Sequence, residues 1–418
     1  MNSTAMLAEA RKQTDRLFDV VVEGALYDRP IAERHRLVFY LGHLEAFDWN
    51  LLRPHMRNVE AFSPVFDRLF AFGIDPVGGG LPSDAPSDWP ATDEIRGYNR
   101  RVRAMLDDAG HDSRLLCMAL EHRLMHAETL AYMLHQLPLE RKRAQSQAAV
   151  PETEPVRLDV AEIPAGPATL GLARNGAFGW DNEFEAHRVE VGGFAIDRYK
   201  ITNREFLKFV QAGGYQNPRL WTVAAWRWKS EREIAHPVFW KRQGGEWHWR
   251  AMFDEIPLPL DWPAYVSHSE ASAYAKWAGG RLPTEAEWHR AAYGAPDGSE
   301  RPFPWGDEAA GPQHGYFHFD RWDPTPVSAF PESRSGFGVQ GLMANGWEWT
   351  ATPFAPFDGF GPHPSYPGYS ADFFDGRHYV LKGGSARTAG CMLRRSFRNW
   401  FQPHYQYVYA GFRCVRGA

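Results

Sequence analysis

The chain has 418 residues and a formal net charge of −5, from 46 Lys+Arg and 51 Asp+Glu. This length predicts two or three domains, and the mildly acidic balance argues against a general nucleic-acid binder. The chain lacks an apolar run of about 18 residues, so a membrane span is not expected. The three widely spaced cysteines, Cys117, Cys391 and Cys414, rule out a disulfide framework and suit a reducing compartment, so we expect a cytoplasmic location.

The first third of the chain is predicted to be helical. Its apolar residues follow helical spacing over 5–136, with four helices expected at 5–24, 33–57, 94–109 and 113–136. Asp112 or Ser113 can cap the last of them. A stretch rich in Gly, Pro and Asp, residues 74–90, separates the second helix from the third and is long enough for a lid or a crossover loop. Four helices with one long connection predict a four-helix bundle over 1–138.

The remainder of the chain has a different texture. Residues 139–155 are polar, charged and bracketed by prolines, which predicts a linker. From 156 to 418, short segments punctuated by glycine, proline and aromatic residues predict a loop-rich α+β domain. Three capping boxes mark helix starts there, at Thr202–Glu205, Ser267–Glu270 and Thr284–Glu287. The first two helices run into paired glycines, where a left-handed C-cap is expected.

Histidines on the predicted helices form a candidate metal site. His122 and His126 are spaced i, i+4 on the fourth helix, so both imidazoles can reach one metal ion. His43 lies on the second helix, which is expected to face the fourth. Three neutral imidazoles suit Fe(II), Cu(II), Zn(II) or Ni(II) and leave positions for substrate and O2 or water. Spacing alone also allows ordinary hydrogen-bonded histidines, and a second pair with this spacing, His314 and His318, has no helical context.

The second half contains five ordered motifs. They are GGRLPTEAEWHRAAYG (279–294), NGWEWTATPF (345–354), LKGGSA (381–386), RRSFRNW (394–400) and AGFRCVR (410–416). Together they resemble the formylglycine-generating-enzyme-like domain, also called the sulfatase-modifying-factor fold. We expect their tryptophans and Arg281 to be buried scaffold. A formylglycine generator needs two closely spaced cysteines for copper, which Cys391 lacks, so that activity is not expected; Cys391 and Cys414 are predicted to be core thiols.

A helical bundle with H…HxxxH, joined to this aromatic domain, resembles the non-haem iron synthases of ergothioneine biosynthesis. These include the ergothioneine and ovothiol sulfoxide synthases and the selenoneine synthase. The resemblance implies an α+β chain with a DinB-like four-helix bundle and a formylglycine-generating-enzyme-like, C-type-lectin-like domain. It makes His43, His122 and His126 ligands of Fe(II), with O2 as co-substrate. Asn399 and Trp400 match positions that hold hercynine, the betaine of histidine, whose trimethylammonium group a Trp face can attract.

Departures from the family pattern concern the substrates. The residue before the last histidine, often a Gln that contacts hercynine, is Met125 here. Synthases that use γ-glutamylcysteine have an Asp and then an Arg after the Asn-Trp pair, and this chain has neither. Loop 73–90 also lacks the Arg or Lys that an acidic donor would want. The expected donor pocket is uncharged and consists of Phe401, Gln402, His404 and Tyr405.

These features predict an O2-dependent non-haem iron enzyme that forms a C–Se bond between a selenosugar and the imidazole of hercynine. A tyrosine of the family's late loop assists the oxygen chemistry, and Tyr366 and Tyr369 are the candidates. The alternative is an ergothioneine-type sulfoxide synthase that uses cysteine or another thiol. A third hypothesis is a non-catalytic binding protein without iron, whose function would survive loss of the three histidines.

Overall fold

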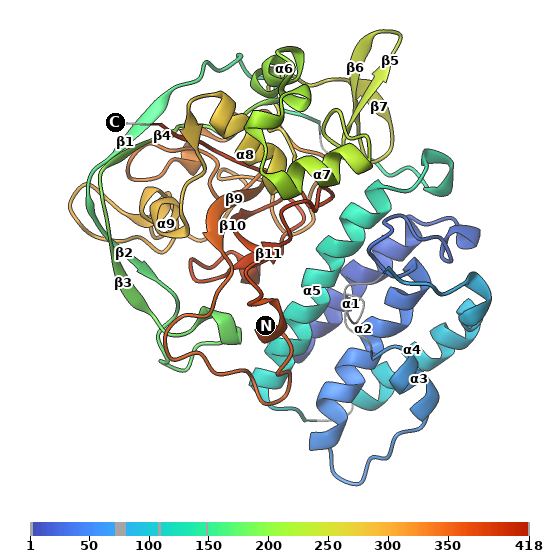
Figure 1. Ribbon diagram of the computed structural model, residues 1–418. Helices are drawn as coiled ribbons and strands as arrows, with labels where there is room; N and C mark the ends of the chain where they lie inside the picture. The colour runs from blue at the N-terminus through green and yellow to red at the C-terminus, as the bar shows by residue number, and fades with distance from the viewer. Residues whose placement is uncertain (1–2, 72–80, 108–109, 148, 417–418) are drawn as a thin grey trace. The chain divides into compact units, whose positions relative to one another are not determined.

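The computed structural model describes residues 3–71, 81–107, 110–147 and 149–416 (Figure 1). Two compact units divide the chain, Met1–Ser146 and Gln147–Ala418. The division falls inside the segment predicted as a linker. The start of that segment belongs to the first unit, because Lys142 pairs with Val21 through a β-bridge.

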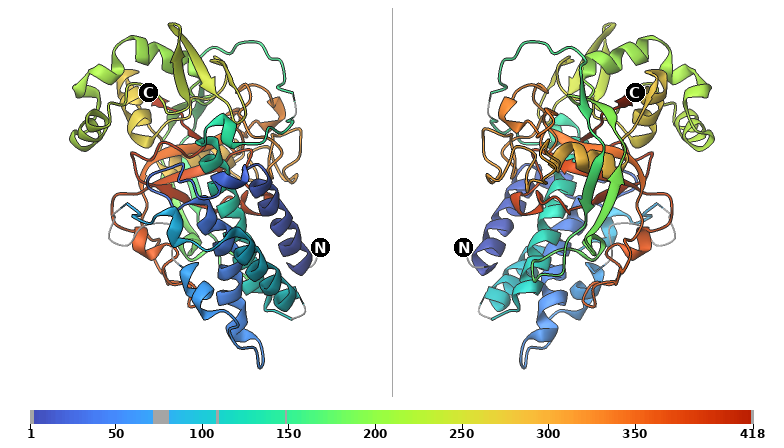
Figure 2. Two further views of the ribbon diagram at one scale, coloured as in Figure 1. Left: turned by 90° about the vertical axis from the view of Figure 1, so that its right-hand side faces the viewer. Right: turned by 90° about the vertical axis from the view of Figure 1, so that its left-hand side faces the viewer.

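The first unit is built from long helices that lie alongside one another (Figures 1 and 2). They are α1 (Ser3–Asp19), α2 (Leu37–Leu52), α4 (Thr92–Asp107) and α5 (Ser113–His135). Helix α5 packs against α1 and α2, and α2 packs against α4. These are the four helices that the apolar spacing predicts. The short elements between them are η1 (Glu23–Ala25), η2 (Arg53–His55), α3 (Pro64–Leu69), η4 (Pro86–Asp88) and η5 (Leu139–Arg141).

Two of the helices are shorter than predicted because local chemistry ends them. Helix α1 stops at Asp19, before three consecutive valines whose β-branched side chains favour the extended backbone. Helix α2 gives way at Leu52 to a 3-10 turn that contains Pro54. The predicted cap of α5 is confirmed, since Asp112 accepts hydrogen bonds from the backbone N–H groups of the next turn at 2.8 and 3.2 Å.

A buried ion network holds the bundle helices in register. Arg123 of α5 is fully buried, and its Nη2 donates to Glu45 Oε2 and to Asp48 Oδ2 of α2, both at 2.7 Å. Arg103 of α4 also donates to Glu45, and Arg11 of α1 lies within 4.0 Å of both carboxylates. Four helices therefore share one set of charges, and removing Arg123 would take away the nearest cationic partner of the buried Asp48.

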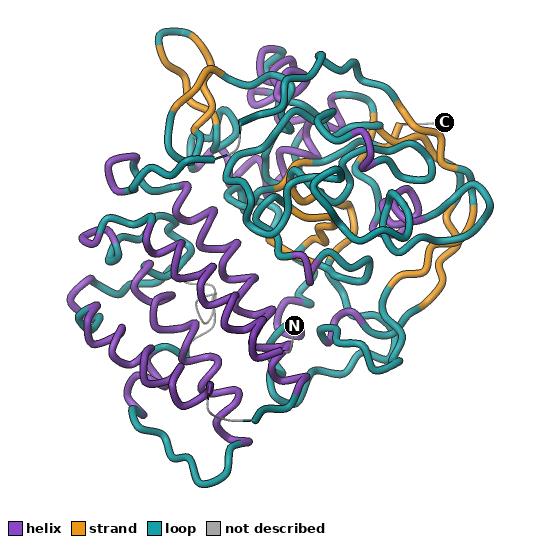
Figure 3. The backbone as a smooth tube through the Cα atoms, turned by 180° about the vertical axis from the view of Figure 1, so that it is seen from behind, coloured by secondary structure: helices purple, strands orange, loops and turns teal. Residues whose placement is uncertain are grey.

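The second unit is loop-rich, as the teal segments of Figure 3 show. Its described strands form two four-stranded sheets, ordered β1-β4-β13-β8 and β11-β10-β9-β12, a β2-β3 pair and a β5-β6-β7 sheet. The strands are β1 (Val160–Ile163), β2 (Gly166–Leu170), β3 (His187–Val191), β4 (Phe194–Asp197), β5 (Trp240–Gln243), β6 (Glu246–Arg250), β7 (Glu255–Pro257), β8 (Gly280–Arg281), β9 (Gly346–Pro353), β10 (Tyr379–Gly384), β11 (Asn399–Phe401), β12 (Ala410–Gly411) and β13 (Val415–Arg416). The strand pairings in these sheets are antiparallel except that of β12 with β9.

Short helices connect these strands. The α-helices are α6 (Asn203–Gln211), α7 (Val223–Glu231), α8 (His268–Trp277) and α9 (Glu285–Tyr293). The 3-10 helices are η6 (Asp181–Glu183), η7 (Gly214–Gln216), η8 (Pro218–Leu220), η9 (Pro331–Ser333), η10 (Ala371–Phe373) and η11 (Gly390–Met392). The predicted α+β class is therefore confirmed, with a helical first unit and a mixed second unit.

The predicted helix ends of the second unit are largely confirmed. Ser267 and Thr284 form reciprocal capping boxes at the starts of α8 and α9. The capping box of α6 is incomplete. Thr202 accepts a hydrogen bond from the backbone N–H of Glu205, but the Glu205 carboxylate pairs with Lys208 instead of bonding back to Thr202. Gly213 and Gly279 adopt left-handed φ angles of 76° and 73° just after α6 and α8.

Tryptophans of the sequence motifs form scaffold, as expected. Trp288 is fully buried, and its Nε1 donates to Glu348 Oε2 at 3.0 Å. Two expectations are wrong. Arg281 lies on the exposed surface, where it pairs with a glutamate of its own motif, because a guanidinium with a nearby partner needs no burial. Cys391 is partly exposed, whereas Cys414 is buried.

In the described part of the chain, no helix is both long and apolar enough to cross a lipid bilayer. Residues 72–80, which include all three glycines of the predicted lid or crossover loop at 74–90, lie outside the described residues. In the remaining part of that loop, Asp84 accepts hydrogen bonds from Arg36 Nε at 2.9 Å and from Trp89 Nε1 at 2.8 Å. These bonds attach the loop to the residue that precedes α2.

Candidate active site

Three histidines converge in the first unit, and we call them the histidine triad. His43 comes from the middle of α2, and His122 and His126 come from α5. The Nε2 atom of His126 lies 3.2 Å from that of His43 and 3.1 Å from that of His122. One ligand atom of each residue lies within 4.8 Å of the others, and all three side chains are at most 3% exposed. The structure therefore brings together the His122/His126 pair that the helical spacing selects and His43 of the second predicted helix.

The triad is neutral at ordinary pH. Burial lowers the pKa of His43 to about 4, and it lowers the pKa values of His122 and His126 well below their usual range. The Nδ1 atom of His43 lies 2.7 Å from the carbonyl oxygen of Phe70. A carbonyl only accepts, so Nδ1 carries the proton and Nε2 keeps its lone pair. Neutral imidazoles with available lone pairs are the form that binds a metal.

The dimensions of the triad fit a transition-metal ion. Two nitrogens that are each about 2.1 Å from one ion, at close to a right angle, lie about 3 Å apart. The observed Nε2 separations of 3.1 and 3.2 Å match this requirement. The donor set contains imidazole nitrogens and no carboxylate oxygen, which favours Fe, Cu, Zn or Ni over Mg or Ca. The described residues form no other group of three or more such ligands.

Aromatic rings fix two of the three imidazoles. Phe47 stacks on His122 with ring centroids 3.4 Å apart, and Phe39 stacks on His43 at 4.8 Å. No sequence motif marks either phenylalanine, although both lie four residues from His43 on α2, which is the spacing that places side chains on one helix face. Met125, next to the last triad residue, is partly exposed. Its thioether offers only weak hydrogen bonding, in contrast to a glutamine at that position.

In the second unit, both predicted tyrosines lie in a cluster of aromatic rings. We define the Trp400 cluster as Trp180, Phe354, Tyr366, Tyr369, Phe373 and Trp400. Phe354 stacks on Trp400 with centroids 4.3 Å apart and planes 5° apart, and Tyr369 meets the same indole edge-on at 5.3 Å. Tyr369 also stacks on Trp180 at 3.9 Å, and Tyr366 lies 5.7 Å from Tyr369. The structure therefore brings Trp400 and the candidate tyrosines together, from segments up to 220 positions apart.

Strand β11 carries two of the predicted substrate-binding residues, Asn399 and Trp400. Side chains alternate along a strand, so Asn399 and Phe401 lie on the opposite face of β11 from Trp400. On their side Phe401 stacks on Tyr405 at 5.0 Å with planes 7° apart. Asn399 and Trp400 are therefore neighbours along the chain whose side chains lie on different faces of the strand. The Oδ1 atom of Asn399 accepts from the backbone N–H of Trp400 at 2.9 Å, which identifies Nδ2 as the donor atom of this amide.

The remaining donor-pocket candidates, Gln402 and His404, are partly exposed in the turn after β11. The His404 ring lies 5.7 Å from Trp228 of α7, a residue that the sequence analysis did not single out. The Trp-Arg-Trp sequence that contains Trp228 matches no functional motif. Only the folded chain shows that Trp228 lies near His404. The turn is held by a backbone hydrogen bond from Ser269 to the carbonyl of Pro403 at 2.8 Å.

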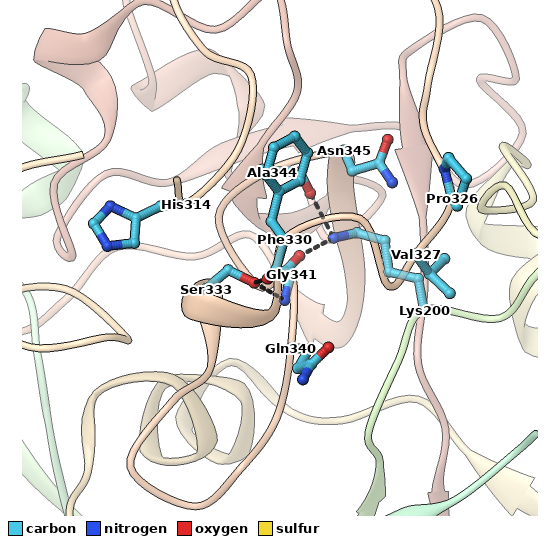
Figure 4. A pocket seen from close by; sticks show the side chains of 10 residues that line it. All are labelled: Lys200, His314, Pro326, Val327, Phe330, Ser333, Gln340, Gly341, Ala344 and Asn345. Carbon is cyan, nitrogen blue, oxygen red and sulfur yellow. Dashed lines mark hydrogen bonds between the residues drawn. The ribbon is translucent and has the colours of Figure 1, made fainter. Parts of the chain in front are cut away.

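A cavity of about 10 Å³ in the second unit is too small for a substrate and has room for roughly one water molecule. Figure 4 shows Lys200 directed into this region, where its ammonium donates to the carbonyls of Gly341 and Ala344. The same ammonium lies 3.0 Å from Glu348. Burial lowers the pKa of Lys200 to about 8. These contacts anchor a loop, so this cavity is structural.

Comparison with known proteins agrees with this arrangement. Residues 146–418 match the family model described as a sulfatase-modifying factor enzyme 1-like domain. Over 98% of its length the chain is 33% identical to the hercynine oxygenase of Mycolicibacterium thermoresistibile and 34% identical to that of Mycolicibacterium smegmatis, covering 93% and 97% of those proteins. It is 27% identical to ergothioneine biosynthesis protein 1 of Neurospora crassa, over 94% of this chain and 55% of that protein. The chain therefore belongs to the hercynine oxygenase and ergothioneine biosynthesis protein family, with a C-terminal sulfatase-modifying-factor-like domain.

Proposed function

We propose that this protein is an O2-dependent non-haem iron oxidoreductase that couples a selenium or sulfur donor to the imidazole of hercynine. The observation that carries the proposal is the convergence of three buried Nε2 atoms, with separations of 3.1 and 3.2 Å. His43, His122 and His126 are its proposed Fe(II) ligands. The donor set alone also suits other metals. Relatives named hercynine oxygenases, matched over nearly the whole chain, favour iron, O2 and hercynine.

Bound Fe(II) would supply the one-electron and O2 chemistry that amino-acid side chains lack. The residues of the chain have three proposed tasks in the reaction. The triad presents three neutral imidazoles from two helices, which leaves room for substrates on the remaining side. Burial of these imidazoles limits the access of water. The phenol Oη of Tyr369 or Tyr366 is the proposed proton donor to the oxygen-derived product.

Hercynine has a trimethylammonium group that cannot donate a hydrogen bond, so its recognition depends on aromatic faces. Phe354 covers one face of the Trp400 indole, and we assign the opposite face to the trimethylammonium. The amide Nδ2 of Asn399 is a proposed hydrogen-bond donor to substrate on the other face of β11, the face that Phe401 shares. Met125 is a further proposed substrate-binding residue, whose thioether would make an apolar contact where a glutamine would make a polar one.

For the donor we propose a selenosugar, which would make the reaction a C–Se coupling that leads to selenoneine after loss of the sugar. Residues 399–407 contain no Asp, Glu, Lys or Arg. Phe401 and Tyr405 present stacked aromatic rings, which pack well on sugar C–H surfaces. Gln402 and His404 provide hydrogen-bonding groups for hydroxyls. The match to ergothioneine biosynthesis protein 1 favours a second candidate, a sulfoxide synthase with cysteine or another thiol as donor.

One experiment separates these candidates. The full-length protein is loaded anaerobically with Fe(II) and mixed with hercynine and either a selenosugar, cysteine or γ-glutamylcysteine in air-saturated buffer. We expect hercynine-dependent O2 uptake and a selenium-containing product by mass spectrometry with the selenosugar. A sulfoxide formed only from a thiol would establish the second candidate instead. Absence of both metal binding and O2 uptake would support a non-catalytic binding protein.

A further inference from the structure

Gly42 is an unusual residue for the middle of α2, because glycine weakens a helix interior relative to alanine. Its conformation does not require glycine, since its φ angle is not positive. The available space, however, requires glycine at this position. A Cβ atom at this position would lie 2.5 Å from Cζ and 2.6 Å from both Cδ1 and Cδ2 of Phe70. Near-equal distances to both sides of the ring show that the ring of Phe70 lies flat against the backbone of α2 at Gly42.

The Phe70 ring has little room to move away from α2. It is fully buried after the end of α3, and other rings surround it. Phe66 meets it edge-on at 5.6 Å, Trp89 stacks at 6.1 Å and Tyr98 lies at 6.4 Å. Protein interiors are close-packed, so an added methyl group at Gly42 would displace the ring and the backbone that carries it.

The backbone of Phe70 contacts the next residue of α2. Its carbonyl oxygen lies 2.7 Å from Nδ1 of His43. Two consecutive residues of α2 therefore meet two parts of one residue: Gly42 meets the ring of Phe70, and His43 meets its carbonyl. The second contact leaves Nε2 of His43 as the nitrogen that faces His126. Partners that hold the second nitrogen of a metal-binding histidine typically contribute 10- to 100-fold to metal affinity.

We propose that Gly42 is a positioning residue for the proposed metal ligand His43. The absence of a side chain lets Phe70 lie on α2, and the Phe70 carbonyl then holds the His43 ring with Nδ1 protonated and Nε2 directed into the triad. This inference rests on the proposed function, in that the triad is taken to bind a metal. The orientation and tautomer of His43 are, however, properties of the metal-free chain and can be measured separately.

The test compares Gly42→Ala with Gly97→Ala in the full-length protein. Gly97 lies in α4, where an added Cβ would approach only the flexible end of Arg100, at 3.8 Å. Anaerobic titration with Fe(II) or Co(II) should show affinity lowered about 10- to 100-fold in Gly42→Ala and unchanged in Gly97→Ala. Nitrogen-15 NMR of labelled histidine in the metal-free protein should show His43 protonated on Nδ1 in the wild type and in Gly97→Ala, and a loss of that preference in Gly42→Ala.

A double-mutant cycle guards against a general loss of folding. Phe70→Leu keeps the backbone carbonyl and gives a side chain whose branched end can turn away from α2. In that background Gly42→Ala should have less than about a threefold effect on metal affinity, because neighbouring sites couple and the clash is gone. Wild-type affinity and tautomer in Gly42→Ala would overturn the positioning role, as would His43 protonated on Nε2 in the wild type. If no variant binds metal but the tautomers change as expected, the positioning role stands and the metal proposal fails.

Discussion

The two units assemble their candidate site residues by different means. In the first unit, two regular helices carry the whole triad, and the i, i+4 spacing of His122 and His126 on α5 needs no distant contact. In the second unit, Asn399 and Trp400 sit on a three-residue strand among loops. A strand this short makes few ladder hydrogen bonds, so its position depends on side chains from elsewhere in the chain.

Buried arginines provide those distant contacts. Arg398, the residue directly before β11, donates to both carboxylate oxygens of Glu285 at 3.0 and 3.1 Å, and to the backbone carbonyls of Asn182 and Ala355. One side chain thus ties β11 to α9, to η6 and to the segment after β9. In the bundle, the comparable Arg123 network joins helices whose own backbone hydrogen bonds already fix their shape. Local helix geometry suffices to place His122 beside His126, whereas the residues of β11 need long-range polar anchors.

Loss of a triad histidine should have the largest effect. His122→Ala removes one of three ligands, so we expect metal affinity to fall by more than about 100-fold and O2 uptake to disappear. Elemental analysis of the anaerobic protein and an oxygen electrode measure this. His318→Asn is the matched control, because this histidine belongs to the other H-x-x-x-H pair, is exposed and has a left-handed φ of 55° that asparagine tolerates. Equal metal content in both variants would contradict the assignment of the triad.

Breaking the buried ion pairs tests whether both units depend on them. Arg123→Met and Arg398→Met each leave a buried carboxylate without its partner, so each should lower the free energy of unfolding by about 3–5 kcal/mol. Urea unfolding followed by circular dichroism measures the loss, and hydrogen exchange locates it. Arg188→Met, whose pair with Glu190 is exposed, should cost less than about 1 kcal/mol. A small effect of Arg398→Met alone would mean that the loop-rich unit has other anchors for β11.

Charge placed beside β11 should change the donor preference. Phe401→Asp combined with Tyr405→Arg introduces a guanidinium that can bind an acidic thiol, and a charge-assisted hydrogen bond contributes about 1.5–3 kcal/mol. Expressed as a ratio of rate constants, this free energy predicts that kcat/KM for γ-glutamylcysteine rises about 10- to 100-fold. We expect kcat/KM for a neutral donor to fall. Phe401→Tyr keeps an uncharged stacked ring and should leave the preference unchanged. An unaltered preference in the double variant would place the donor pocket elsewhere.

Acid should destabilise the metal-free protein through histidines that are buried in the neutral form. Burial lowers the pKa of His268 to about 3, while the unfolded residue takes up a proton below about pH 6.5. The unfolded state then binds more protons, so stability falls as pH decreases from 6.5, by about 1.4 kcal/mol per pH unit for each such histidine. Urea titrations at pH 7, 6 and 5 should give a shallower pH dependence for His268→Phe, which keeps a ring against Tyr379. Parallel slopes for the variant and wild type would refute the effect.

Prediction from the sequence succeeds where the physics is local. The four bundle helices, the Asp112 cap and the reciprocal boxes at Ser267 and Thr284 depend on residues within one or two turns. The predicted ends of α1 and α2 lie beyond the observed ends, because valines end the first helix earlier and a proline ends the second. The six-residue helix α3 was not predicted, because it is too short for apolar periodicity to appear.

The candidate site was only partly predictable for the same reason. The spacing of His122 and His126 is a property of one helix, but the approach of His43 to 3.2 Å depends on the packing of α2 against α5. The contacts of Phe354 and Trp180 with the Trp400 cluster join segments that no local pattern relates.

The order of residues alone was enough to establish the α+β class, the helical first part, the histidines worth considering and the resemblance to a family. These features arise from periodicity, capping and motifs that short stretches of chain carry. Folding decided the rest: the convergence of three Nε2 atoms, the carbonyl that selects the tautomer of His43, and the opposite faces of Asn399 and Trp400. Each of these depends on contacts between distant segments or on a strand boundary, and close packing determines them only when the whole unit is assembled.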